Sequence, residues 1–139
     1  MACWMEQEKQ RVSRRRLAEL EVQEAFFKGL LARDPRDTDV IEELADVLLQ
    51  MGRTLDVISL DQRLIELRPT DPDARYNLAC SLALLRDYER AANELSTAIE
   101  LGFHDVDSLN SDPDLAGLRA HPAYRRVRAC LTRIRGRQE

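Results

Sequence analysis

Apolar residues recur at helical intervals through most of the chain. One such run is Ile41, Leu44, Ala45 and Leu48. Its members follow one another at steps of three, one and three residues, so they share one side of a helix. Because this spacing returns in later segments, the pattern predicts an all-α protein.

The helical pattern repeats at an offset of 34 residues, which aligns Thr38–Asp71 with Pro72–Asp105 without a gap. The identical apolar pairs in this register are Leu44 and Leu78, Ala45 and Ala79, Leu48 and Leu82, Ile65 and Ile99, and Leu67 and Leu101. A period near 34 is typical of stacked helical hairpins, in which each unit buries its apolar face on the next. The repeat therefore predicts a solenoid.

Turn-forming residues divide each repeat into two helices. Gly52 follows the first helix of repeat 1, where positive φ lets a chain reverse. Pro72 starts the next repeat in a first helical turn, with Asp71 as its N-cap. In repeat 2 the reversal is expected at Arg86-Asp87.

The second repeat resembles a tetratricopeptide repeat over Ala74–Leu101, and Thr38–Asp71 resembles a more divergent one. The family's three small positions are Ala79, Ala91 and Ala98 in repeat 2, and Ala45, Val57 and Leu64 in repeat 1. The family's aromatic residue at the fourth position is replaced by Ile41 and Arg75. The resemblance implies a right-handed superhelix with a concave groove. It also implies a large apolar residue where Asp61 stands, so a buried Asp61 must have a hydrogen-bonding or basic partner.

The flanking segments are less regular. We expect one long helix over Glu6–Arg33, with a projecting first half. The apolar stripe of its second half is Leu17, Leu20, Phe27, Leu30 and Leu31. Near the other end, Asp112-Pro113 and His121-Pro122 are helix-start signals.

The final segment is predicted to cap the repeats. Tyr124, Val127, Leu131 and Ile134 fall at helical spacing and predict a helix over the open end of the stack. The sequence before this helix resembles the segment that terminates bacterial tetratricopeptide arrays. The predicted organisation is one domain. Its parts are a long helix with a degenerate repeat helix (1–37), repeat 1 (38–71), repeat 2 (72–105) and a capping segment (106–139).

Composition narrows the class of protein. The chain has 139 residues, is 44% apolar and 33% charged, and has a net charge of −4, which is typical of a soluble helical protein. With no long apolar run and no signal sequence, we expect a cytoplasmic protein without a membrane span. Cys80 and Cys130 are expected to be buried thiols.

Catalysis and cofactors are not predicted. His104 and His121 lack the spacing of metal ligands, and no glycine-rich phosphate loop is present. His121 precedes a proline, so we expect a capping or turn role for it. The sequence thus indicates a non-enzymatic protein with neither metal nor cofactor.

Acidic residues cluster on the first helix of repeat 1. Asp39, Glu42, Glu43 and Asp46 occupy steps of three, one and three, so their carboxylates share a face. The resemblance places these positions in the concave groove, together with Asp73, Tyr76, Asn77 and Cys80 of repeat 2. The face is either a solvated surface or a groove for a basic, or mixed basic and apolar, protein segment.

Two functions remain open from the sequence: an adaptor or scaffold, and a small chaperone for a secreted or complex-forming client. Carboxylates in the groove disfavour the acidic chaperone tails that some family members hold through basic residues. Nucleic acid is disfavoured because the arginine tracts lack interleaved aromatic residues. A secondary contact is predicted at Trp4, Arg14, Arg15 and Arg16.

Overall fold

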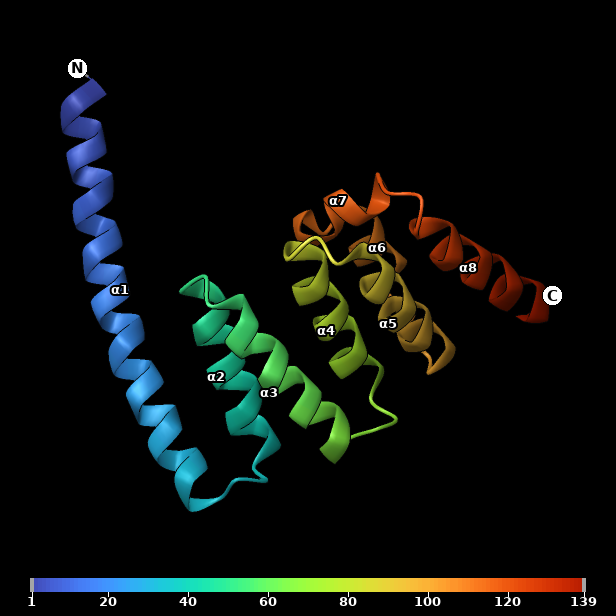
Figure 1. The fold of residues 1–139 in the computed structure, drawn as a ribbon, viewed down its shortest axis with the longest axis horizontal. Helices are drawn as coiled ribbons and strands as arrows, with labels where there is room; N and C mark the ends of the chain where they lie inside the picture. The colour runs from blue at the N-terminus through green and yellow to red at the C-terminus, as the bar shows by residue number, and fades with distance from the viewer. Residues whose placement is uncertain (1, 139) are drawn as a thin grey trace. The chain divides into compact units, whose positions relative to one another are not determined.

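The computed structural model describes the backbone of residues 2–138 and the side chains of residues 13–137. Every regular element in this part of the chain is helical, which confirms the predicted all-α fold of helical hairpins (Figure 1). The helices are α1 (Ala2–Arg33), α2 (Thr38–Gln50), α3 (Thr54–Leu67), α4 (Pro72–Leu84), α5 (Tyr88–Glu100), α6 (Val106–Ser111), the 3₁₀ helix η1 (Pro113–Leu115), α7 (Ala116–Arg119) and α8 (Tyr124–Gln138).

The chain forms two compact units, Met1–Val57 and Ile58–Glu139, and each is described by itself. The division falls inside α3, so it does not follow the 34-residue repeat. The bounds of the four segments and the single domain expected from the sequence remain predictions.

The first unit is built on α1 and α2, which pack against each other. Three residues of α1 at steps of four face the end of α2. Arg16 donates a hydrogen bond to Gln50, Leu20 is buried, and Glu24 accepts one from Arg53. Leu17, which was predicted to belong to the buried stripe, is 44% exposed, because it lies next to Arg16, which contacts Gln50 at the end of α2, where little of that helix remains to cover it. The N-terminal end of α1 extends past α2 (Figure 1).

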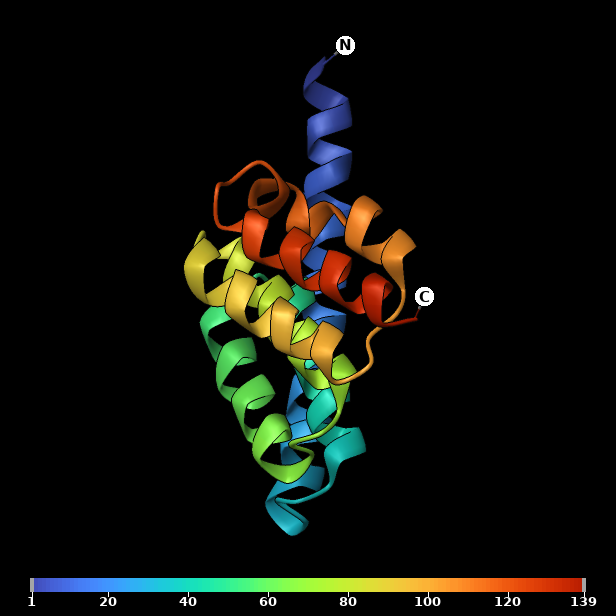
Figure 2. The same cartoon turned by 90° about the vertical axis from the view of Figure 1, so that its right-hand side faces the viewer.

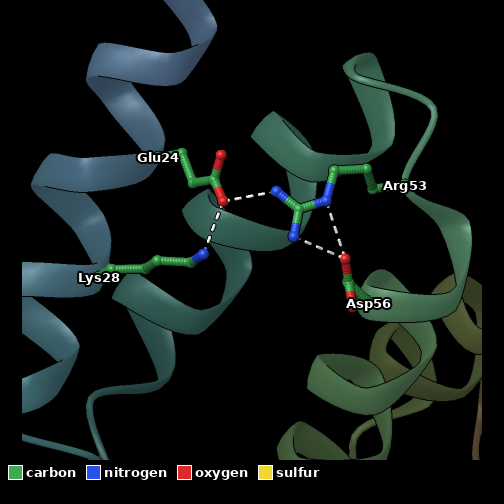
Figure 3. A network of polar contacts seen from close by, with 4 residues as sticks. All are labelled: Glu24, Lys28, Arg53 and Asp56. Atoms are coloured by element: carbon green, nitrogen blue, oxygen red, sulfur yellow. Dashed lines mark hydrogen bonds and ion pairs between the residues drawn. The ribbon is translucent and has the colours of Figure 1, made fainter.

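A polar network ties α1 to the start of α3 within the first unit. The carboxylate of Glu24 accepts from Lys28 Nζ and Arg53 Nη1, both at 2.6 Å, and Arg53 also pairs with Asp56 (Figure 3). The hydrogen bonds from Lys28 and Arg53 lower the pKa of Glu24. Because Glu24 lies on α1 and Arg53 follows α2, the network joins α1 to the turn between α2 and α3.

The second unit is organised around the hairpin of α4 and α5. Its core combines apolar residues of both helices with Leu109, Leu115, Leu118 and Val127 from the terminal segment. The segment η1–α7 packs on α4, and α8 packs on α5 (Figure 2). Ala91, at one of the family's small positions, is fully buried. The terminal segment therefore shares one core with repeat 2, whereas its role as a cap stays a prediction.

The helix ends follow the predicted turn chemistry. Asp37 and Asp71, 34 residues apart, are N-caps that accept backbone N–H bonds from Val40 and Asp73. At the hairpin reversals, Gly52 and Arg86 both adopt positive φ, at 76° and 62°. The next backbone N–H then donates to the carbonyl oxygen five residues back in each hairpin, from Arg53 to Leu48 and from Asp87 to Leu82.

Candidate functional site: the acidic face of α2

The four carboxylates of α2 lie together on its exposed side. Asp39, Glu42, Glu43 and Asp46 are all exposed. The opposite side of the helix is buried through Ile41, Leu44, Ala45, Val47 and Leu48. We call the four carboxylates the acidic face. Its geometry follows from the sequence, because an apolar stripe that must be buried leaves the other side of the helix to water.

The C-terminal end of the acidic face is held by a short chain of hydrogen bonds. Gln50 donates to Asp46 Oδ2 at 3.0 Å and accepts from Arg16 at 2.6 Å. Arg16 also pairs with Glu19. This arginine, predicted as part of a separate N-terminal contact, therefore lies beside the end of α2. Trp4 of that predicted contact lies outside the residues whose side chains are described, whereas Arg14 and Arg15 are exposed.

The corresponding positions of α4 have a different environment. Asp73 and Asn77 are exposed, but Tyr76 is half-buried and Cys80 is buried. The Tyr76 hydroxyl donates to Asp112 Oδ2 at 2.6 Å, and the Cys80 thiol contacts the same oxygen at 3.7 Å. The Tyr76 ring stacks on Phe103, with centroids 4.4 Å apart. Two of the four predicted contact residues in α4 are thus engaged by the terminal segment.

Burial and the Asp112 carboxylate shape the chemistry of this cluster. Burial, as the larger cause, and the hydrogen bond to Asp112 raise the pKa of Tyr76. Burial also raises the pKa of the Cys80 thiol, and the charge of Asp112 adds to the effect. Both groups therefore stay protonated at neutral pH, which removes Cys80 as a nucleophile. Cys80 and Cys130 are buried free thiols, as predicted.

Sequence reasoning missed Asp112 as a partner of α4. Its Asp-Pro context predicted a helix start, and Asp112 does cap η1 by accepting from the backbone N–H of Asp114 at 2.9 Å. The other carboxylate oxygen is the one that reaches Tyr76 and Cys80. Tyr76 and Asp112 are 36 residues apart and are not related by the 34-residue repeat, so no sequence signal connects them. His121, by contrast, has the predicted turn role, because its ring accepts from the backbone N–H of Ala123 at 3.1 Å.

Asp61 has the partner that the sequence required of it. The side chain is 3% exposed, and its Oδ2 accepts a hydrogen bond from Ser81 Oγ at 3.2 Å. Burial raises the pKa of Asp61 to about 7, and the Ser81 hydrogen bond offsets part of that rise. Asp61 is consequently a buried acid that titrates near neutral pH rather than a contact residue.

A hollow lies between α5 and α8 and was not predicted from the sequence. It measures about 520 Å³, and its lining residues are Asn93, Ser96, Thr97, Glu100, Arg126, Ala129, Cys130 and Arg133. Its two arginines are already paired, Arg126 with Glu89 and Arg133 with Glu100. Both ion pairs join α8 to α5. The arginines that line the hollow therefore hold the last helix in place.

The described side chains offer no metal site, since no group of three His, Cys, Asp or Glu residues among them could hold an ion. No helix in the described part of the chain is long and apolar enough to cross a membrane.

Comparison with known proteins connects the fold to a repeat family. Residues 62–92, from the middle of α3 into α5, match a family model described as a tetratricopeptide repeat. The chain is 34% identical over 87 residues to the peroxisomal targeting signal receptor of Eremothecium gossypii, covering 63% of this chain and 15% of that protein. It is 33% identical over 81 residues to the Candida glabrata protein of the same name, covering 58% and 13%. The chain thus matches only a small part of either relative.

Proposed function

We propose that the protein is a non-catalytic interaction module that binds a protein segment through the acidic face of α2. The observation that carries this proposal is the set of four exposed carboxylates at helical spacing on one side of α2. The tetratricopeptide match at residues 62–92 supports a binding role, and both relatives are receptors by name. The proposed setting is the cytoplasm.

The chemistry of the acidic face defines the partner. Clustered carboxylates attract lysine and arginine side chains and repel acidic segments, so the partner presents basic residues. On α4, the predicted contact residues Asp73 and Asn77 are exposed as well, and they remain a separate prediction. We therefore propose a basic, or mixed basic and apolar, segment as the bound element, held in an adaptor or scaffold.

The test measures binding of a fluorescent basic peptide that alternates lysine and leucine. Glu42→Lys combined with Asp46→Lys should weaken binding at least about tenfold and reduce its dependence on salt concentration. The matched control reverses two exposed carboxylates on other helices, Glu66→Lys with Asp107→Lys, and so makes the same change in net charge.

The control distinguishes binding at the acidic face from a general attraction of the basic peptide to the negatively charged protein. If the face is the site, the control retains most of the wild-type affinity. Equal weakening in both variants would reduce the effect to net charge and reject the acidic face. Circular dichroism of both variants checks that the helices are retained.

A further inference from the structure

The side of α1 that faces away from α2 is unusually apolar. Opposite the contact line of Arg16, Leu20 and Glu24, the helix presents a row of exposed residues that carry no charge. They are Ala18, Val22, Ala25, Gly29 and Ala32, and we call them the outer row. Val22 in this row is 71% exposed, and Phe26 at its edge is 60% exposed. The solvent side of a surface helix normally carries polar residues, so α1 has a second apolar side that no described residue of its own unit covers.

The outer row has the spacing of a helix–helix contact. Its members follow one another at steps of four, three, four and three residues over four helical turns. This is the heptad pattern that keeps one seam of a helix against another helix. Charged residues flank the seam, with Glu21 and Lys28 on one side and Glu19 and Arg33 on the other. Such a charged border beside an apolar row is the usual arrangement of a helix–helix seam.

Gly29 provides an independent indication of close approach. Its φ is not positive, so the backbone does not require glycine there. A Cβ atom added at Gly29 would meet nothing within 4 Å, so neighbouring groups of the chain do not require it either. Glycine in a helix interior is less favourable than alanine. A second helix that packs closely against the outer row would explain the residue, because it leaves no room for a side chain at the contact.

We propose that the outer row of α1 is the contact surface of a homodimer, in which α1 packs antiparallel against α1 of a second copy. A two-fold axis near the middle of the row places Val22 against the partner's Ala25 and Ala18 against the partner's Gly29. In each of these two pairs the larger side chain meets a smaller one. We call each pair a layer. Because the arrangement is symmetric, every layer occurs twice and the interface is self-complementary.

The charges beside the outer row favour a second copy of this chain as the partner, and they favour an antiparallel pair over a parallel one. In this register Glu21 lies beside the partner's Lys28, and symmetry repeats the pair. A parallel pair would instead bring Lys28 close to the partner's Arg33, which is repulsive. Lys28 already donates to Glu24 at 2.6 Å, but its side chain is 54% exposed and can reach a second carboxylate. This inference goes beyond the proposed binding function and does not rest on it, because the acidic face lies on α2.

The first test is sedimentation velocity of the full chain from about 1 to 200 μM. The wild type should dimerise in this range, since four turns of helix make a small interface. Ala25→Lys with Gly29→Lys should weaken dimerisation at least about 100-fold, because two charges would enter an apolar seam. Both residues are exposed, and lysine favours helix over glycine, so the monomer should keep its melting temperature.

The matched control adds the same charges to another exposed helical surface, through Ala129→Lys with Thr132→Lys on α8. It should dimerise like the wild type. A wild type that stays monomeric at 200 μM would overturn the proposal, and so would a dimer that Ala25→Lys with Gly29→Lys leaves intact.

The second test addresses direction. Glu21→Lys alone should weaken the dimer several-fold, and adding Lys28→Glu should restore it, because each new pair is again oppositely charged. In a Cys3→Ser background, a mixture of Val22→Cys and Ala25→Cys chains should form a mixed disulfide faster than either chain alone forms a symmetric one. Failure of both rescue and mixed cross-linking would overturn the antiparallel register. Peptide binding by the acidic face is measured separately, so the two proposals can fail independently.

Discussion

The helices α2 and α4 occupy equivalent positions 34 residues apart, yet one side of α2 is open and most of α4 is covered. In α2 the buried residues form one stripe and the acidic face is exposed. In α4 the residues at three further positions, Ala74, Cys80 and Ala83, are also buried, and Asp112 engages the side that corresponds to the acidic face. The difference shows that one repeat pattern can leave a helix side open to solvent or bury it, according to what packs on it.

The helices that follow α2 and α4 differ in the polarity of one buried position. Asp61 in α3 corresponds to Leu95 in α5, and both side chains are buried. Leu95 meets the apolar core directly, whereas Asp61 relies on Ser81 to satisfy one oxygen. At this position the first hairpin therefore buries a carboxyl group where the second buries an apolar side chain.

The largest expected effect is the pH dependence caused by Asp61. The folded pKa of about 7 lies above the reference value of 3.8, so between these pH values the unfolded chain loses a proton that the folded chain keeps. The stability of the wild type should consequently fall by roughly 2–4 kcal/mol as the pH rises from 4 to 8. Asp61→Asn cannot ionise and should lose this part of the dependence. Urea unfolding at pH 4, 6 and 8 measures it, and identical pH profiles for the two proteins would contradict the buried acid.

Replacing Asp61 by the residue of the second hairpin sharpens the comparison. Asp61→Leu with Ser81→Ala removes both polar groups and should stabilise the protein at pH 8 by about 1–4 kcal/mol, as replacement of buried charges by apolar residues often does. At pH 4, where Asp61 is protonated, the gain should be much smaller. A double variant that is less stable than wild type at pH 8 would show that the apolar pair does not fit the site.

Asp112→Ala should have the next largest effect. It removes the carboxylate that covers one side of α4, which has no counterpart on α2. The substitution leaves the half-buried Tyr76 hydroxyl without its acceptor and removes the N-cap of η1, with an expected loss of about 2–3 kcal/mol. Tyr76→Phe removes the donor, so in the double variant the two losses should not add. Strict additivity in urea unfolding would mean that the 2.6 Å contact carries no coupling.

A smaller effect is expected at the two hairpin reversals. Arg86 adopts a left-handed conformation that costs a residue with a side chain roughly 1 kcal/mol, and Gly52 adopts it without that cost. Arg86→Gly should stabilise the second hairpin by about 0.5 kcal/mol, since greater freedom of the unfolded chain cancels part of the gain. Gly52→Ala should destabilise the first hairpin by about 1 kcal/mol. Thermal melting of both variants checks the opposite signs.

The sequence predicts the features of this fold that depend on local chemistry. Periodic apolar residues locate the helices, Asp71 marks an N-cap, and Gly52 marks a reversal, because each of these depends on neighbours a few residues away. The reversal at Arg86 is found only through the 34-residue register, since arginine itself does not favour positive φ.

Long-range contacts could not be predicted in the same way. The acidic face follows from the spacing on α2, but the covering of Tyr76 and Cys80 depends on Asp112, which lies outside the repeat. The apolar outer row of α1 was also missed, because the stripe predicted from the sequence followed the opposite side of the helix, where Leu20 is buried. A helix with apolar residues on two sides needs a structure to tell which side its own chain uses.

The smallest expected change in stability concerns the acidic face itself. Glu43 and Asp46 are exposed, so Glu43→Gln with Asp46→Gln should change the free energy of unfolding by less than about 0.5 kcal/mol. Asp46 accepts a hydrogen bond from Gln50, and a glutamine at position 46 can still accept it. Binding of the basic peptide should nevertheless weaken several-fold, because two of four attracting charges are lost. Tyr76→Phe on α4 should do the reverse, lowering stability while leaving peptide binding nearly unchanged. If the α2 variant instead loses stability and keeps its affinity, the exposed carboxylates are structural and the functional contrast between the two helices disappears.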